Sequence, residues 1–142
     1  MSAQEEVRRA SEQFYAALNR MANGDPGLMP GAWSHGPEVT AMHPIDGREI
    51  GWEAVKASFD QFAQVATDGI IDLKDQFIRV EGDIAYELGV EQGKATLGGH
   101  SVAYKHRVTN IYRREGEGWR MIHHHSDTSP AMLEVLSRLQ AG

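Results

Sequence analysis

The sequence predicts an α+β domain in which a curved antiparallel sheet wraps around N-terminal helices, with a further helix at the C-terminus. Helical patterns fill the first half of the chain, a stretch rich in β-forming residues runs from Ile70 to about residue 126, and a short helical pattern follows. Because helices and strands are segregated along the chain, the helices are expected to pack on one face of the sheet. Such a sheet encloses a concave space.

Composition limits the classes of protein that this chain can represent. The chain has 142 residues, 41% of them hydrophobic, which is enough to form one hydrophobic core. Residues 1–142 are therefore expected to form a single domain. The net charge of −6, without a basic run, argues against nucleic acid or an anionic membrane as partner. The chain has no cysteine, and neither a signal peptide nor a membrane span of ~20 apolar residues is evident, so we expect a cytoplasmic protein.

The first helix is predicted from its start signal and its apolar spacing. Ser2 and Glu5 form a capping box. Apolar residues then recur at helical spacing at Val7, Ala10, Phe14, Leu18 and Met21. The Asn-Gly-Asp-Pro run at 23–26 ends this helix.

A short strand and a second helix follow a loop rich in Gly and Pro. The strand, residues 38–42, precedes His43-Pro44. A helical stripe is formed by Trp52, Val55, Phe59, Phe62 and Ala66. The Thr-Asp-Gly run at 67–69 is expected to end that helix.

From Ile70 onward the sequence predicts a four-stranded meander and then a last helix. Turn residues divide the strands at 81–83, 91–94 and 115–118. Ser129-Pro130 then provides an N-cap and a proline at the first helical position. Met132, Leu133, Leu136 and Leu139 form one face of the helix that follows.

The order of elements and three segments carry a resemblance to a known superfamily. The segments are "FYAALNRMANGD", "VTAMHPIDGREIGWEAVKASF" and "RVTNIYRREGEGWRMIHHHSD". They resemble the ketosteroid isomerase-like, or nuclear transport factor 2-like, superfamily and within it the SnoaL-like proteins. The last segment is also similar to the association domain of calcium/calmodulin-dependent protein kinase II, which shares the double arginine, the Gly turn, the Trp and the His-x-His. The resemblance implies a cone-shaped pocket, a homodimer and no cofactor.

The resemblance also suggests individual site residues. His43-Pro44 stands where the isomerases have their catalytic Asp-Pro, so an imidazole replaces the carboxylate. Tyr15 is similar in position to the oxyanion-hole tyrosine, whereas the second acid of that hole has no match. The catalytic aspartate of SnoaL-like cyclases falls at Ser126, with Asp127 one residue further on.

Histidine is the residue type that suits proton transfer near neutral pH, which singles out His43 and the triple histidine. In a strand, His124 points to one face and His123 and His125 point to the other. The resemblance turns position 126 inward, and therefore His124. A one-residue slip in the hairpin would instead turn His123 and His125 into the pocket.

Arg107 has the same strand parity as Thr109, and the resemblance turns this face into the cone. Arg107 is then either a clamp for a carboxylate- or carbonyl-bearing ligand or a structural ion pair with Glu87 or Asp127. Trp33 and His35 are candidates for the lip of the pocket, where an aromatic ring packs on a flat ligand. Trp33 could equally close the open end of the core.

A metal site is the third possibility for the histidines. His123 and His125 on one strand face, with His106 on the neighbouring strand and Asp127 nearby, have suitable ligand chemistry. The spacing lacks the specificity of a motif such as H-E-x-x-H. The main prediction is therefore that no metal and no cofactor are needed.

Three functional hypotheses follow, and the residues leave open whether the chain is an enzyme. The first is a cofactor-independent isomerase, dehydratase or cyclase. It would use His43 and His124 for proton transfer and Arg107 with Tyr15 to stabilise charge on an oxygen, with Asp127 as a further candidate. The second is a non-catalytic ligand-binding or oligomerisation module, and the third is a metal enzyme with His106, His123 and His125 as ligands.

Overall fold

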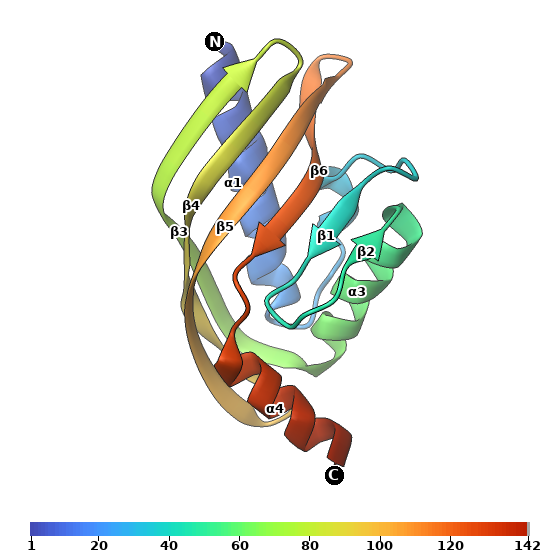
Figure 1. Cartoon of the computed structure of the whole chain (residues 1–142), viewed down its shortest axis with the longest axis vertical. Coiled ribbons are helices and arrows are strands. Elements are labelled where there is room, and N and C mark those ends of the chain that lie inside the picture. The colour runs from blue at the N-terminus through green and yellow to red at the C-terminus, as the bar shows by residue number, and fades with distance from the viewer. Residues whose placement is uncertain (142) are drawn as a thin grey trace.

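The computed structural model describes residues 1–141 and has the expected α+β architecture, with helices against one face of a curved sheet (Figure 1). The six strands are arranged in the order β2-β1-β6-β5-β4-β3. The elements are α1 (Ala3–Met21), α2 (Met29–Ala32), β1 (Thr40–Met42), β2 (Glu49–Ile50), α3 (Trp52–Val65), β3 (Ala66–Glu81), β4 (Ile84–Leu97), β5 (His100–Glu115), β6 (Gly118–Ser126) and α4 (Pro130–Ala141). Of these, α2 and β2 lie in segments expected to be irregular.

The sheet is mixed and not wholly antiparallel. β1 pairs with β6 in parallel, while the other neighbouring strands pair antiparallel. β1 and β6 are far apart in the sequence and are not joined by a hairpin, so no tight turn forces them to run in opposite directions.

The long helix α1 begins at the predicted capping residue and fills the hollow of the sheet. Ser2 Oγ accepts a hydrogen bond from the Glu5 amide at 3.1 Å. The predicted apolar stripe is buried, and Phe14 is completely covered. This burial, and not helix propensity, is the main source of the helix's stability.

The turn predicted at 91–94 is wrong, because β4 continues through it to Leu97. The actual turn between β4 and β5 is at Gly98 and Gly99, whose φ angles are +56° and +87°. Gly93 serves a different purpose: a Cβ there would lie 1.9 Å from the Ile70 carbonyl oxygen. A glycine inside a strand here marks a close backbone approach and not a turn.

Helix α3 ends at Val65, two residues before the Thr-Asp-Gly run that was expected to end it, and residues 67–69 already belong to β3. The pairing with β4 shifts between Thr67 and Ile70, and Asp68 has a φ of 52°. The turn-forming residues therefore create an irregularity within the strand, which bends it directly after α3.

A second irregularity, at Ile122 in β6, decides which histidines face the helices. Tyr112 pairs with Met121, and the next residue of β5, Ile111, pairs with His123. Ile122 is thus an extra, bulged residue. Beyond it His124 and Ser126 are buried on the inner face, while His125 is exposed on the outer face.

The two faces of the sheet have different surroundings. Helices α1, α3 and α4 all lie on the inner face, with α4 at the end furthest from the N-terminus (Figure 1). Within residues 1–141, no helix has the length and hydropathy needed to cross a membrane.

Candidate functional site

A largely apolar cavity of about 410 Å³ lies between the inner face of the sheet and the helices. This volume falls in the range typical of small-molecule sites, about 300–1,000 Å³. Its apolar wall includes Leu18, Met21, Phe59, Phe62, Val65, Ile71, Met132, Leu136 and Leu139. Its polar wall includes His43, Ser58, Glu91, Tyr104, His106 and His124, with Asp46, Glu49, Gln61 and Gln140 also lining it.

The central polar feature of the cavity wall is a buried pair, Glu91 and His106. They are cross-strand partners on β4 and β5, and His106 Nε2 donates to Glu91 Oε1 at 2.8 Å. Each side chain is only 5% exposed. The other ring nitrogen of His106, Nδ1, is buried without a partner among the described residues.

Glu91 is held as a carboxylate by its neighbours. Burial raises its pKa, but hydrogen bonds from His106 and Tyr15, together with the nearby imidazoles, outweigh burial and lower the pKa overall. The Tyr15 hydroxyl donates to Glu91 Oε2 at 2.8 Å, and Ser126 Oγ lies 3.3 Å from Oε1. The carboxylate is therefore ionised and fully hydrogen-bonded, and it orients His106.

His43 lies in the cavity wall, as the sequence predicted. Its Nε2 is 2.8 Å from Ser58 Oγ, and its ring stands edge-on to Phe59. Burial, assisted by the neighbouring His124, lowers the pKa of His43 from about 6.5 to about 3. His43 is therefore uncharged at neutral pH.

His124 is the histidine of the triple run that faces the cavity, as the sequence analysis favoured. Its Nδ1 is 2.6 Å from Asn110 Oδ1, and its ring centroid is 6.1 Å from that of His43. Burial lowers its pKa against the opposing effect of Glu91. The cavity thus brings His43, His124 and the Glu91–His106 pair together.

A second buried carboxylate, Glu87, supports this group from behind. It is completely buried and accepts hydrogen bonds from Gln76 Nε2, Asn110 Nδ2 and Tyr112 Oη at 2.7–2.9 Å. Asn110 Nδ2 also donates to the Tyr15 hydroxyl at 3.0 Å. Asn110 therefore links Glu87 both to His124 and, through Tyr15, to Glu91.

Arg107, Thr109 and Asp127 lie outside the cavity, on the outer side of the sheet. The prediction that Arg107 points into the cone is wrong: its side chain is 83% exposed and pairs with Asp127 at 2.8 Å. Thr109 shares this outer face, because Asn110, and not Thr109, pairs with His124. The strand parity was predicted correctly, but the face assigned to it was reversed, so the structural ion pair with Asp127 is the alternative that holds.

Trp33 and His35 do not form the lip of this cavity. Trp33 is fully buried in the core near Phe14 and Phe59. His35 stacks on Trp52 with ring centroids 4.4 Å apart, and its Nε2 lies 2.7 Å from the Pro30 carbonyl. Their positions fit a structural role, with Trp33 closing the end of the core.

The structure does not assemble the proposed metal ligands. His106 faces the cavity, whereas His123 and His125 lie on the opposite side of the sheet, and His123 is bound to Thr40 at 2.7 Å. Across residues 1–141 no group of three His, Cys, Asp or Glu side chains is arranged to hold a metal ion.

Sequence reasoning missed Glu91 and Tyr104 as cavity residues and considered His106 only as a metal ligand. It also missed Asn110, which lies in the supporting network behind the wall. A signal was present: Val102, Tyr104, His106, Val108, Asn110 and Tyr112 alternate along β5 and are all buried. Polar residues that share the parity of an apolar stripe are candidates for a buried hydrogen-bonded network. The nearby turn residues of 91–94 hid Glu91, because that segment was interpreted as a loop.

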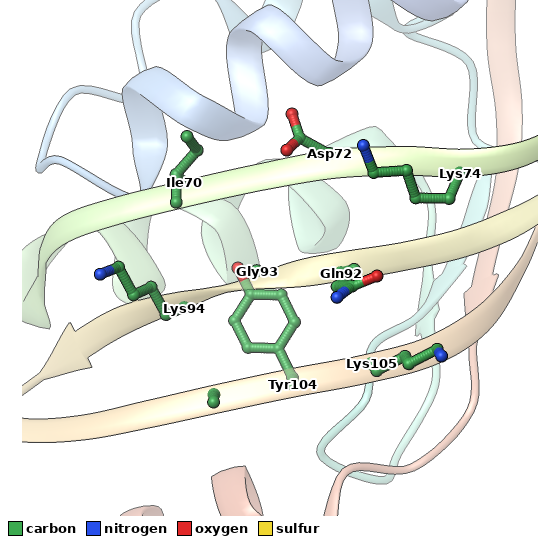
Figure 2. Close-up of a pocket in the computed structure, with 9 residues that line it drawn as sticks. Ile70, Asp72, Lys74, Gln92, Gly93, Lys94, Tyr104 and Lys105 are labelled. Atoms are coloured by element: carbon green, nitrogen blue, oxygen red, sulfur yellow. The ribbon is translucent and has the colours of Figure 1, made fainter.

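A second hollow, of about 690 Å³, lies on the outer face and has a different character (Figure 2). It is shallow and is bordered by Lys74, Lys94 and Lys105, three of the four lysines in the chain. Figure 2 also shows the Tyr104 ring extending from β5 across Gly93. Its three lysines are exposed to solvent, in contrast to the buried Glu91, His106 and His124 of the inner cavity.

A comparison with known families agrees with this architecture. The family described as the SnoaL-like domain matches residues 7–132. The chain belongs to this family. No curated protein sequence matches the chain.

Solved structures related to this SnoaL-like chain share its fold and have diverse descriptions. A proposed dehydratase of the NTF2-like family from Streptomyces avermitilis is 24% identical, with a TM-score of 0.76 over 89% of this chain and 96% of that one. A proposed calcium/calmodulin-dependent protein kinase II association domain from Thiobacillus denitrificans is 25% identical, with a TM-score of 0.69 over 86% and 94%. An NTF2-like superfamily protein from Salmonella enterica is 19% identical, with a TM-score of 0.78 over 88% and 89%.

Proposed function

We propose that this SnoaL-like protein is a cofactor-independent enzyme that moves protons on a small apolar molecule, as an isomerase or dehydratase does. The observation that carries the proposal is the buried Glu91–His106 pair in the wall of an apolar cavity. Hydrogen-bonded, desolvated titratable groups that face a cavity are typical of acid–base sites.

In this proposal the pair is the principal proton-transfer group. When His106 gains a proton, the adjacent Glu91 carboxylate stabilises the imidazolium, and the low-dielectric surroundings strengthen that attraction. His43 is a weaker base, because burial has lowered its pKa to about 3. His43 and His124 are better suited to accept hydrogen bonds from the reacting molecule and to receive protons transiently.

The predicted roles of Tyr15 and Arg107 change accordingly. Tyr15 already donates its hydroxyl proton to Glu91, so it positions the carboxylate instead of stabilising an oxyanion. Arg107 lies on the other face of the sheet. Tyr104 takes the oxygen-stabilising role here, since it lines the cavity, its hydroxyl has no partner in residues 1–141, and burial raises its pKa and keeps it protonated.

The test is solvent deuterium exchange into the α-carbons of a panel of uncharged cyclic ketones, followed by mass spectrometry. Proton-transfer catalysis predicts exchange well above the buffer rate and a loss of about 10²–10⁴-fold in His106→Gln. The matched control is His125→Gln on the outer face, which should exchange like the parent protein. Exchange that His106→Gln leaves unchanged would refute the assignment.

A second candidate function is an assembly module, and the outer face of the sheet favours it. Phe77, Tyr86 and Leu88 are exposed there, and the helices of residues 1–141 lie on the other side. Exposed apolar patches of this kind mark protein interfaces. In this reading two copies form a homodimer through their sheets, a state equally compatible with catalysis.

Light scattering of the untagged protein tests this second candidate. A dimer that Leu88→Lys converts to a folded monomer supports the sheet interface, with Thr96→Lys at the far end of β4 as the control. A parent protein that is monomeric at 100 µM would exclude it. The related fold of the kinase association domains supports the idea without showing an oligomeric state for this chain.

A further inference from the structure

The positions of protons in the cavity can be assigned from the hydrogen-bond network, beginning with His43. Ser58 Oγ has one proton, which it donates to the Val55 carbonyl at 2.6 Å. Ser58 must therefore accept from His43 Nε2–H at 2.8 Å. An uncharged His43 then has its lone pair on Nδ1, which receives no hydrogen bond from the described residues.

The same reasoning assigns His124. Asn110 Nδ2 donates to Glu87 and Tyr15, so Asn110 Oδ1 must accept from His124 Nδ1–H. The lone pair of His124 is therefore on Nε2. Ser126 Oγ is 3.3 Å from this nitrogen and 3.3 Å from Glu91 Oε1, and its single proton can serve only one of them. Donation to the carboxylate leaves His124 Nε2 without a donor.

Hydrogen-bond donors are scarce in the same wall. Ser58 Oγ already donates its proton to the Val55 carbonyl, and His106 Nε2–H already donates to Glu91. The Tyr104 hydroxyl is the remaining free donor among the buried lining groups of residues 1–141. With His106 uncharged, the wall holds three imidazole lone pairs, on His43 Nδ1, His124 Nε2 and His106 Nδ1, and one free hydroxyl. The His106 nitrogen is the proton-transfer atom of the proposed function, which leaves His43 and His124 to bind the ligand.

The charges of the wall exclude an anionic ligand. The lining described in residues 1–141 includes Asp46, Glu49 and Glu91 and no lysine or arginine. Because Arg107 lies outside the cavity, a bound carboxylate would be buried without a counter-charge. Burying an unpaired ion costs on the order of several kcal/mol. This argues against the carboxylate-bearing ligand expected from the sequence.

We infer that the cavity takes an apolar molecule whose hydroxyl group donates a hydrogen bond to His43 or His124, and that it excludes carboxylates of the same shape. The inference rests on the proposed function, since it names the ligand class of that same site. Tyr104 can in addition donate to a carbonyl or ether oxygen of the ligand. A hydroxyl-bearing ligand is also the class from which a dehydratase removes water.

The test uses three compounds that share one rigid apolar cage: 2-adamantanol, 2-adamantanone and 2-adamantanecarboxylate. Dissociation constants are measured by calorimetry with the untagged protein at pH 7.5. We expect the alcohol to bind at least 5-fold more tightly than the ketone, which cannot donate, and at least 10-fold more tightly than the carboxylate. Tightest binding of the carboxylate or the ketone, or no saturable binding of the alcohol, would overturn the inference.

Substitutions of the two histidines identify which imidazole accepts the hydrogen bond of the ligand hydroxyl. His43→Ala should reduce the preference for alcohol over ketone to within about twofold, and His124→Ala is the alternative if His43→Ala does not fold. His125→Ala, on the outer face, should retain the full preference. A preference that survives both inner substitutions would contradict the proposed contact.

This experiment is independent of turnover. An alcohol preference without any deuterium exchange would remove the proposed enzymatic function and leave the ligand class intact. Deuterium exchange without an alcohol preference would remove the proposed ligand class and leave the proposed enzymatic function intact.

Discussion

The two faces of β4 and β5 consist of alternate residues of the same strands, yet their chemistry differs completely. His106 and Arg107 are neighbours in sequence, and their side chains are 5% and 83% exposed. His106 is paired with a buried carboxylate, whereas Arg107 pairs with Asp127 in solvent. The burial of the partners, more than the type of residue, decides which of the two pairs affects stability and reactivity.

The comparison explains how one thin sheet can serve both a cavity and a surface. On the inner face, Glu87, Glu91, Asn110 and His124 lose their contact with water and satisfy one another. On the outer face, lysines and arginines stay hydrated, and substitutions there should have small effects. Each of the following predictions compares an inner residue with an outer one.

The largest effect is expected from Glu91→Ala. The substitution leaves His106, Tyr15 and Ser126 without their common acceptor inside the protein. We expect a loss of about 3–5 kcal/mol in the free energy of unfolding, measured by urea denaturation. Gln92→Ala, the next residue and an exposed one, should change it by no more than about 0.5 kcal/mol. Equal effects of the two substitutions would contradict the burial argument.

The second largest effect is expected from Asn110→Leu, which should lower the free energy of unfolding by about 2–3 kcal/mol. The reason is that Glu87, Tyr15 and His124 each lose a hydrogen-bond partner. It should also alter the tautomer of His124. Nitrogen-15 NMR of the imidazole should show the proton on Nδ1 in the parent protein and a shift towards Nε2 in the variant. Thr109→Val, on the outer face, should leave the tautomer unchanged. A parent His124 with its proton on Nε2 would contradict the assigned network.

The next prediction concerns the pH dependence of stability. His43 has a pKa of about 3 in the folded chain against about 6.5 when unfolded, so below pH 6.5 the unfolded state binds a proton that the native state does not. The stability linked to His43 is therefore complete above pH 6.5 and is lost as the pH falls towards 3. Between pH 7 and pH 5 we expect a loss of about 2 kcal/mol from this residue.

His43→Gln should remove that part of the pH dependence, as measured by urea denaturation at the two pH values. His125→Gln, which removes an exposed histidine of the outer face, should retain it. Parallel pH profiles for the parent protein and His43→Gln would show that His43 titrates normally in the folded state.

The smallest effect is expected for Arg107→Ala. Its ion pair with Asp127 is solvent-exposed, and such pairs contribute about 0–1 kcal/mol. Binding of 2-adamantanol should not change, because Arg107 does not line the cavity. A large loss of ligand affinity, measured by the same calorimetry, would restore the role that the sequence analysis gave this residue.

Local signals predicted much of the fold from the sequence. The Ser2 cap, the apolar stripe of α1 and the turns at 81–83 and 115–118 all depend on neighbouring residues, and all are found in the structure. The prediction of a turn at 91–94 was wrong because glycine occurs both in turns and where two backbones approach closely. Gly93 allows β3 to approach closely, and only the packed sheet distinguishes that use from a turn.

For the site, the sequence by itself determined that His43 and a histidine of 123–125 were candidates, because their chemistry and their position beside a proline or in a strand are local properties. It also determined that Arg107 and His106 point to opposite faces. It could not determine which of these faces was the inner one, and Arg107, Thr109 and Asp127 were placed on the wrong side.

For the triple histidine, the tertiary structure decides the inner face through a single residue, Ile122. Trp119 and Met121 face inward, and strict alternation would then turn His123 and His125 inward and His124 outward. The bulge at Ile122 reverses the faces, so that His124 lines the cavity and Ser126 is buried on the same face. Side chains in a strand repeat every two residues, so one extra residue redirects all that follow, and its presence depends on pairing with β5.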